Sequence, residues 1–288
     1  KNKTEIYSIG NPGDLTYPCT NIGSSTSIIK EMAENKNEIS NKIKSSKKPL
    51  IIIGDSALNG KIGKYVFETI KGFLYNNNFI REDWNALNTL PQQASTVGAV
   101  DLGLYSINDT NNFIFFNKLI NNEFKFLYLL GADTTNIDKE DKFIVYQGSH
   151  GDRGAEIADI ILPGAAYTEK DGLFINLEGK LQYAYKASYP PGESREDWKI
   201  FIDLAGKMKK TLGFNNIYEL RDKIKKQIDL NLKRKNIEIK KTDFIDSEIL
   251  INKIDYYYTN PIARSSKTMS ECRQVTKNFL HTGIEKAS

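Results

Sequence analysis

The stretch that decides the fold runs from Ala158 to Gln182 and reads Ala-Asp-Ile-Ile-Leu-Pro-Gly-Ala-Ala-Tyr-Thr-Glu-Lys-Asp-Gly-Leu-Phe-Ile-Asn-Leu-Glu-Gly-Lys-Leu-Gln. Its first apolar run, Ile160 to Leu162, is stopped by a Pro-Gly pair, which is typical of a strand that leaves a sheet. Two further runs, Leu173 to Leu177 and Leu181 to Tyr185, are rich in apolar and aromatic residues. The residues between them, Glu178 to Lys180, include a glycine that can adopt a positive φ, so we predict a β-hairpin with a three-residue loop.

Strands and helices alternate in the sequence pattern ahead of this stretch. Leu50 to Ile53 is a continuous apolar run that ends at a glycine, and Phe124 to Leu130 and Phe143 to Tyr146 are similar runs. Such runs are typical of strands covered on both faces, as in a parallel sheet. After the first run, apolar residues recur at helical spacing and predict one buried helix face, made of Ile62, Val66, Ile70 and Leu74. We therefore predict an α/β fold: a mainly parallel sheet flanked by helices, with a β-hairpin and extended N- and C-terminal arms.

Polar side chains that can accept hydrogen bonds from free backbone N–H groups mark further helix starts. We predict such starts at Ser24 or Ser25, at Asp109, at Ser194 with Asp197, at Asn216 with Glu219, and at Ser266. The helix that starts at Ser194 is expected to be stopped by Gly213.

Composition shifts divide the chain into three parts. Residues 1–46 are predicted to form an N-terminal arm with a short helix, residues 47–232 the α/β domain, and residues 233–288 a charged linker and a C-terminal interaction tail. The tail carries three consecutive tyrosines, Tyr256 to Tyr258. Because an extended segment gains stability by covering such aromatic surface, we predict that the tail contacts another subunit.

The overall composition is that of a globular protein. Of 288 residues, 40% are hydrophobic and 26% are charged, and the formal net charge is +4. Disordered chains have fewer hydrophobic residues and a higher net charge, so this composition indicates a folded chain. No apolar run approaches the roughly 20 residues needed to cross a bilayer, so membrane association is expected only indirectly, through partners.

Lysine clusters raise the question of a nucleic-acid partner. They lie at Lys42 to Lys48, Lys207 to Lys210, Lys223 to Lys226 and Lys233 to Lys241. A nucleic-acid surface gathers such charges along one phosphate track and often adds aromatic residues for stacking. These clusters are scattered and lack interleaved aromatic residues, so we interpret them as solvated helix faces and predict no nucleic-acid partner.

Few residues could carry chemistry. The two cysteines, Cys19 and Cys272, and the two histidines, His150 and His281, predict neither an iron–sulfur site nor a disulfide framework nor a metal site. His150 could be a base oriented by Asp152, but no nucleophile lies in a recognisable elbow beside it. We favour a glycine-rich turn that is pinned by a hydrogen bond of Asp152 or of the arginine after it.

A phosphate-binding loop is a second possibility for chemistry. Gly54, Gly60 and Gly63 lie between a predicted strand and the start of a predicted helix, where anions can bind. Their spacing matches neither the dinucleotide-binding nor the P-loop pattern, and tight turns after strands need glycine anyway. We therefore predict no catalytic, cofactor-binding or metal-binding residue in this chain.

Several segments together carry a resemblance to a known family. The hairpin stretch from Ala158 to Gln182 resembles the corresponding segment of the molybdopterin oxidoreductase superfamily. Tyr146 to Gly154, Pro190 to Trp198 and the tail from Arg264 to Cys272 make the likeness more specific. They resemble the family of the largest iron–sulfur subunits in the peripheral arm of respiratory complex I, NADH:ubiquinone oxidoreductase. The likeness extends from Ile9 to Cys272 and concerns the C-terminal part of that family.

The resemblance implies a non-catalytic structural subunit of complex I that keeps the molybdopterin oxidoreductase fold without its catalyst. FMN and the iron–sulfur clusters are then expected on partner subunits, and no cofactor on this chain. The implied partners are other complex I subunits, especially a cysteine-rich iron–sulfur half of the same ancestral subunit and the flavin-arm subunits. That half is expected on a separate polypeptide or in a longer chain. The implied location is the matrix side of the mitochondrial inner membrane, in the peripheral arm.

Two other functions stay open at the level of sequence. One is an active fragment of a molybdopterin-dependent oxidoreductase. The other is a nucleotide-binding α/β protein that uses the loop from Gly54 to Gly63.

Overall fold

The computed structural model describes residues 4–104, 118–119, 121–134, 137–233, 237–251 and 255–277. The chain forms two compact units. Among the described residues, unit 1 draws on Lys1–Gln93, Asn236–Asp255 and Gln274–Ser288, and unit 2 on Ala94–Lys235 and Tyr256–Arg273. The predicted boundaries at 46/47 and 232/233 stay a prediction, and the helix predicted from Asp109 lies outside the described residues.

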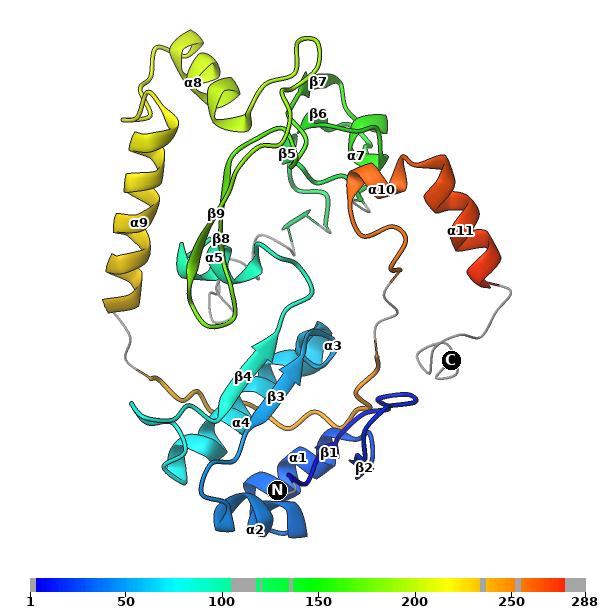
Figure 1. The fold of residues 1–288 in the computed structure, drawn as a ribbon, viewed down its shortest axis with the longest axis vertical. Coiled ribbons are helices and arrows are strands. Elements are labelled where there is room, and N and C mark those ends of the chain that lie inside the picture. Colours follow the sequence, from blue (N-terminus) through cyan, green and yellow to red (C-terminus); the bar gives the residue numbers. More distant parts are fainter. Residues whose placement is uncertain are drawn as a thin grey trace. The chain divides into compact units, whose positions relative to one another are not determined.

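Unit 1 is built on a pair of parallel strands and the helix between them. Strand β3 (Ile51–Gly54) lies beside β4 (Leu87–Leu90), with Ile51 opposite Leu87 (Figure 1). The chain from β3 to β4 forms α3 (Asp55–Leu58), the 3-10 turn η1 (Gly60–Ile62) and α4 (Gly63–Asn76).

Helix α4 forms because its apolar residues fall on one face. Val66, Ile70 and Leu74 are all buried in the core of unit 1, as their spacing predicts. Helix α1 (Thr26–Ala33) supplies Ile29 and Met32 to the same core.

The N-terminal residues complete unit 1. Ser25 caps α1 as predicted, since its hydroxyl accepts a hydrogen bond from the Ser27 N–H. Helix α2 spans Glu38–Ser45, and the short strands β1 (Tyr7–Ser8) and β2 (Thr20–Asn21) pair in parallel.

The segment 237–251, predicted as part of the linker and tail, is bound to unit 1. The backbone N–H of Lys240 donates to the fully buried carboxylate of Glu68 at 3.0 Å. The Thr26 hydroxyl donates to the carbonyl of Ile245 at 2.7 Å, and Ile249 enters the core.

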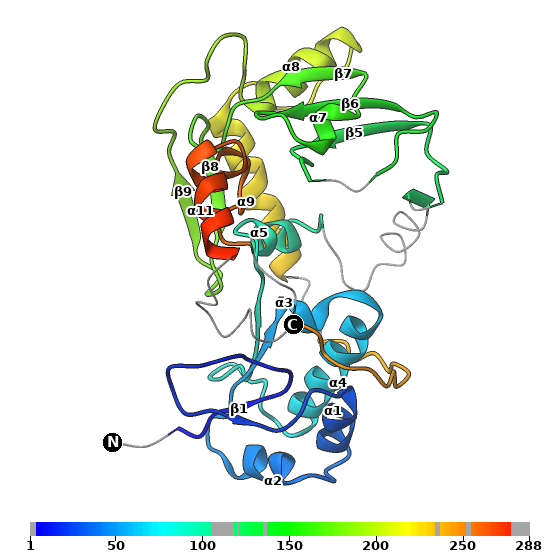
Figure 2. The same ribbon diagram turned by 90° about the vertical axis from the view of Figure 1, so that its right-hand side faces the viewer.

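Unit 2 contains a three-stranded parallel sheet. Figure 2 shows β5 (Phe126–Leu130), β6 (Phe143–Gly148) and β7 (Ile160–Pro163) side by side in that order. The central strand β6 is buried along most of its length, as a continuous apolar run predicts. The core of the unit gathers on it and comprises Leu127, Leu129, Ile144, Tyr146 and Ile157.

Helices and a hairpin complete unit 2. Strands β8 (Gly172–Ile175) and β9 (Leu181–Ala184) form the predicted antiparallel hairpin. The helices are α5 (Thr96–Asp101), α7 (Arg153–Glu156), α8 (Asp197–Lys207), α9 (Ile217–Lys233), α10 (Pro261–Arg264) and the part of α11 (Lys267–Lys277) up to Arg273. The predicted α/β class with mainly parallel pairing is therefore confirmed, with the pairing divided among separate small sheets.

The hairpin loop is longer than predicted. It runs over five residues, from Asn176 to Lys180, because the Asn176 side chain accepts hydrogen bonds from the N–H groups of Glu178 and Lys180. The expected positive φ at Gly179 is confirmed, at 79°.

Two further helix starts are confirmed and one is wrong. Asn216 caps α9, and Ser266 accepts a hydrogen bond in the first turn of α11. Ser194 is no cap, because its hydroxyl donates to the Pro191 carbonyl and α8 begins at Asp197. Helix α8 also ends at Lys207, before the predicted stop at Gly213.

Candidate functional site

The carboxyl ends of β5, β6 and β7 are the natural place for a site in unit 2. In α/β sheets, ligands bind in the crevice outside the carboxyl ends of parallel strands. Here Asp133 follows β5, and His150 and Asp152 follow β6. Two networks of polar side chains occupy this edge of the sheet.

The first network joins the strand ends to the C-terminal segment. Tyr146 on β6 donates from its hydroxyl to Asp133 at 2.5 Å. Arg264 on α10 donates from Nε to Asp152 at 2.9 Å and from Nη2 to Asp133 at 3.3 Å. The predicted tail therefore binds unit 2 of its own chain at this point (Figure 1).

This network changes the acidity of Tyr146. Burial raises the pKa of its hydroxyl well above the usual range, and the hydrogen bond to Asp133 and the negative charges of Asp133 and Asp152 add to that rise. The phenol is therefore held in its neutral form, as a donor to a carboxylate.

We expect Tyr146→Phe to lower the free energy of unfolding by about 2 kcal/mol at pH 7, because a hydrogen bond to a charged group is lost. The pKa of Tyr146 is raised on folding, so its contribution is complete below the unfolded-state pKa of about 10 and is lost as pH rises beyond it. Urea denaturation of both proteins between pH 7 and pH 11 measures this. A difference that stays constant over that range would contradict the prediction.

The second network closes the sheet edge against α8. Gln147 is fully buried on β6 and donates to Asp197 at 2.8 Å. The Tyr128 hydroxyl donates a hydrogen bond to the side-chain oxygen of Gln147. Lys170 pairs with Asp197 at 2.5 Å. These polar groups therefore bind one another.

The sequence-predicted site residues are placed as follows. His150 lies beside Ser149, with 2.9 Å from Nδ1 to the hydroxyl, and the Asp152 carboxylate bonds Arg264. The interpretation as a turn pinned by Asp152 is therefore confirmed. The predicted absence of catalytic, cofactor-binding and metal-binding residues stays a prediction.

In the loop after β3, Gly63 has a packing role. A Cβ atom there would lie 1.9 Å from the carbonyl oxygen of Leu58. This close approach of two backbone segments explains the glycine without any phosphate.

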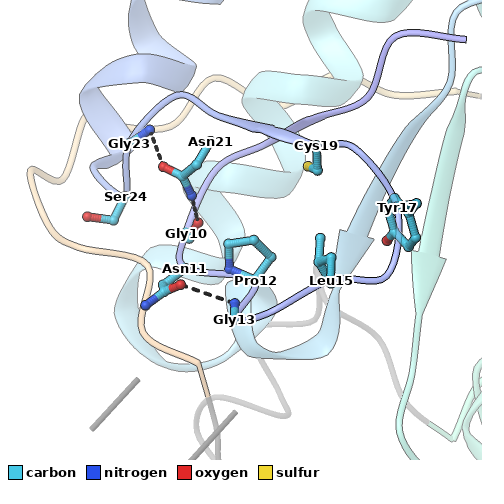
Figure 3. A pocket seen from close by; sticks show the side chains of 10 residues that line it. All are labelled: Gly10, Asn11, Pro12, Gly13, Leu15, Tyr17, Cys19, Asn21, Gly23 and Ser24. Carbon is cyan, nitrogen blue, oxygen red and sulfur yellow. Dashed lines mark hydrogen bonds between the residues drawn. The ribbon is translucent and has the colours of Figure 1, made fainter. Parts of the chain in front are cut away.

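A cavity of about 420 Å³ lies within the loop between β1 and β2, and no sequence motif marks it (Figure 3). Figure 3 shows the Asn21 side chain between Gly10 and Gly23: it donates to the Gly10 carbonyl and accepts from the Gly23 N–H at 2.9 Å. The lining residues carry no charged side chain, and their one thiol is Cys19. The three glycines of this stretch, Gly10, Gly13 and Gly23, all adopt a positive φ, and in the sequence they indicate a loop and nothing more specific.

Two further features, a cluster of metal ligands and a membrane-spanning helix, would also indicate a function. Across the described part of the chain, no three His, Cys, Asp or Glu side chains gather closely enough to hold a metal ion. Within the described ranges, no helix combines the length and the apolar character that crossing a bilayer requires.

The fold and these networks define a class: an α/β protein with parallel strands whose carboxyl ends are closed by its own side chains. Residues 1–207 match the family model described as molybdopterin oxidoreductase. The chain belongs to the molybdopterin oxidoreductase family. Residues 219–272 match a second model, which describes the C-terminal part of a subunit of NADH-ubiquinone oxidoreductase.

The curated relatives make the same point in more detail. The chain is 38% identical to the NADH-ubiquinone oxidoreductase 75 kDa subunit of Reclinomonas americana, over 94% of this chain and 40% of the relative. It is 37% identical to the mitochondrial 78 kDa subunit of Candida albicans, over 94% and 39%. It is 36% identical to an NADH-quinone oxidoreductase subunit of Rickettsia felis, over 93% and 40%. The chain spans about two-fifths of the length of these relatives, and the predicted family resemblance is confirmed.

The family implies a pterin cofactor with phosphate groups, and the strand ends offer little to such a group. An anionic group needs free cations or free N–H donors. At this edge the cations Arg264 and Lys170 are bound to three carboxylates, those of Asp133, Asp152 and Asp197. Acidic side chains outnumber basic ones there and repel phosphate. The described side chains of these two networks therefore do not fit the phosphate groups of the cofactor.

Proposed function

We propose that this chain is a non-catalytic structural part of an NADH:quinone oxidoreductase of the complex I type. The observation that carries the proposal is the match over 94% of the chain to a 75 kDa subunit of NADH-ubiquinone oxidoreductase. The closed strand ends support it, because the side chains of the sheet edge are used for internal bonds. The chain then contributes shape and contacts to the assembly.

The redox groups of the assembly belong to its other parts under this proposal. Most iron–sulfur clusters are held by four cysteine thiolates, whereas this sequence offers two, Cys19 and Cys272, which form no C-x-x-C pair. FMN and the clusters are therefore placed on partner subunits. The overall reaction is NADH oxidation coupled to quinone reduction and proton translocation.

The proposed partners are other subunits of the same complex, since the relatives are named as subunits of NADH-ubiquinone oxidoreductase. We place the chain beside a cysteine-rich iron–sulfur part of the same ancestral subunit and beside the flavin-arm subunits. One of the relatives is named a mitochondrial subunit, which supports a mitochondrial location. The matrix side of the inner membrane is the finer part of this proposal.

Native electrophoresis of membranes solubilised in mild detergent, followed by mass spectrometry, tests the proposal. The chain is expected in the band that oxidises NADH, together with a cysteine-rich polypeptide. Element analysis of the purified chain is expected to give far less than one molybdenum or tungsten per chain. A free-standing chain with turnover of its own, or stoichiometric molybdenum, would overturn the proposal in favour of an active oxidoreductase fragment.

A further inference from the structure

The end of α8, the start of α9 and the residues between them form the α8–α9 turn, residues 204–218 (Figure 1). This turn exposes the large apolar side chains of Leu204, Met208, Leu212 and Tyr218. Met208 and Tyr218 are the most open of them, at 64% and 73% exposed. A single exposed apolar residue is ordinary, but several in one short stretch are typical of an interaction surface.

The charged side chains of the α8–α9 turn are all positive. Residues 204–218 contain three lysines, Lys207, Lys209 and Lys210, and no aspartate or glutamate. All three lysines are exposed. Among the described residues, their side chains form no ion pair and no hydrogen bond. The lysines therefore lie beside exposed apolar side chains, which a purely solvated helix face would not present.

The two carboxylates that flank the turn do not neutralise it. Asp203, just before the turn, pairs with Arg195. Glu219, just after it, accepts hydrogen bonds from the Asn216 amide and from the Asn215 N–H, both at 2.8 Å. The turn thus presents three positive charges without a counter-charge from its own chain.

The backbone of Lys209 points the same way. Its φ is 56°, in the left-handed region that follows the end of many helices and favours glycine. The N–H of Lys209 donates to the Gly206 carbonyl at 3.0 Å, and the N–H of Lys210 donates to the Ala205 carbonyl at 2.8 Å, which ends α8. The chain therefore carries a positive side chain at a position where glycine would be more stable.

We infer that the α8–α9 turn is a docking surface for an acidic, partly apolar segment of a partner polypeptide. Carboxylates of such a segment neutralise the lysines, and its apolar side chains cover Met208 and Tyr218. Charge complementarity favours this occupant over a second copy of the same turn, because two copies would bring like charges together. The inference rests on the proposed function only for the identity of the partner, which is then a neighbouring subunit.

The test uses the full chain and three labelled peptides, with fluorescence anisotropy as the readout. The first peptide alternates Asp or Glu with Leu or Phe, the second replaces the acids by their amides, and the third replaces the apolar residues by Ser. At about 50 mM NaCl the first peptide is expected to bind at least about tenfold more tightly than either of the others. Its advantage over the second is expected to shrink at about 300 mM NaCl, because salt screens exposed charges.

Two variants separate the contributions of charge and apolar surface. The triple variant Lys207→Gln, Lys209→Gln and Lys210→Gln is expected to bind the first peptide at least about tenfold more weakly. The double variant Met208→Ser and Tyr218→Ser keeps the charges, and it is expected to remove the advantage of the first peptide over the third. Both variants change exposed side chains, so circular dichroism is expected to show an intact fold.

A matched control locates the binding. The triple variant Lys44→Gln, Lys47→Gln and Lys48→Gln removes three exposed lysines from unit 1 and lowers the net charge equally. It is expected to leave the affinity within about twofold of the wild type, since these charges lie outside the turn. Equal weakening in both triple variants, or equal affinity for the first and third peptides, would overturn the inference, because binding would then follow net charge alone.

Vesicles that contain phosphatidylserine are the remaining probe. Binding to them that is tighter than binding to the first peptide, and that is lost in the triple variant of the turn, would overturn the inference in favour of a membrane surface. The peptide measurements need no other subunit, so their failure contradicts this inference alone. Absence of the wild-type chain from the band that oxidises NADH contradicts the proposed function alone.

Discussion

Gly63→Ala is expected to lower the free energy of unfolding of the chain by about 3 kcal/mol, because the structure has no space for the new methyl group. It would lie 1.9 Å from the oxygen and 2.4 Å from the carbon of the Leu58 carbonyl. Both atoms belong to the backbone, so no change of rotamer relieves the clash. The φ of Gly63, −56°, suits any residue, and the cost therefore comes from overpacking alone. Urea denaturation followed by far-UV circular dichroism measures the loss.

Gly54→Ala is the matched control at the other end of the same loop. A Cβ atom at Gly54 meets nothing within 4 Å, and its φ of −71° is ordinary. We expect a change of less than about 0.5 kcal/mol. If Gly63→Ala proved as harmless as Gly54→Ala, packing would no longer explain the glycine, and the loop would again be a candidate for binding phosphate.

The apolar runs predicted where strands form, but burial on both faces holds only for some of them. Phe143 to Tyr146 lies in β6 and is largely buried, whereas the run from Leu50 to Ile53 contains β3, in which Ile52 is 52% exposed. Val66 with Leu74 became the buried face of α4. The same runs could not predict how the strands divide into separate sheets. A four-residue apolar run indicates a strand and does not show which strand lies beside it.

Helix starts depended on competition between nearby groups. Asn216 and Glu219 cap α9 through reciprocal hydrogen bonds, as their three-residue spacing predicts. Ser194 had the same kind of spacing, but its hydroxyl is taken by the Pro191 carbonyl three residues earlier. The rigid turn before Ser194 therefore prevents it from capping α8, and the spacing rule for helix caps does not take such a turn into account.

No local sequence pattern predicted the side chains that close the sheet edge. Arg264 lies 131 residues from Asp133 and 112 from Asp152 in the sequence. Long-range charge pairs of this kind need the folded chain to become visible.

Arg264→Ala is expected to lower the free energy of unfolding of the chain by about 3 kcal/mol. The Arg264 side chain is 16% exposed and its partners Asp133 and Asp152 are 10% and 21% exposed, so its removal leaves two largely buried carboxylates without their cation. Breaking a buried ion pair from one side costs more than the pair contributes, because the remaining charge stays out of water. Urea denaturation at pH 7 measures the loss.

Arg195→Ala is the control for the loss of a cation. Arg195 pairs with Asp203, and the two side chains are 58% and 60% exposed, so water and salt screen their attraction. Less than about 0.5 kcal/mol should be lost. Arg264→Lys is expected to fall between the two, since one ammonium keeps the charge but cannot reach both carboxylates in the geometry of the guanidinium.

The same three variants decide what the C-terminal segment does. If Arg264 holds α10 on its own unit, Arg264→Ala destabilises the isolated chain with no partner present. If the segment serves only a neighbouring subunit, as its aromatic run alone suggests, the isolated variant unfolds like the wild type and the defect appears on assembly. A wild-type unfolding curve for Arg264→Ala would therefore contradict the internal role and leave the contact with another subunit as its function. If the isolated Arg264→Ala variant unfolds at lower urea concentration but assembles normally, the role of the segment is to close the sheet edge of its own chain.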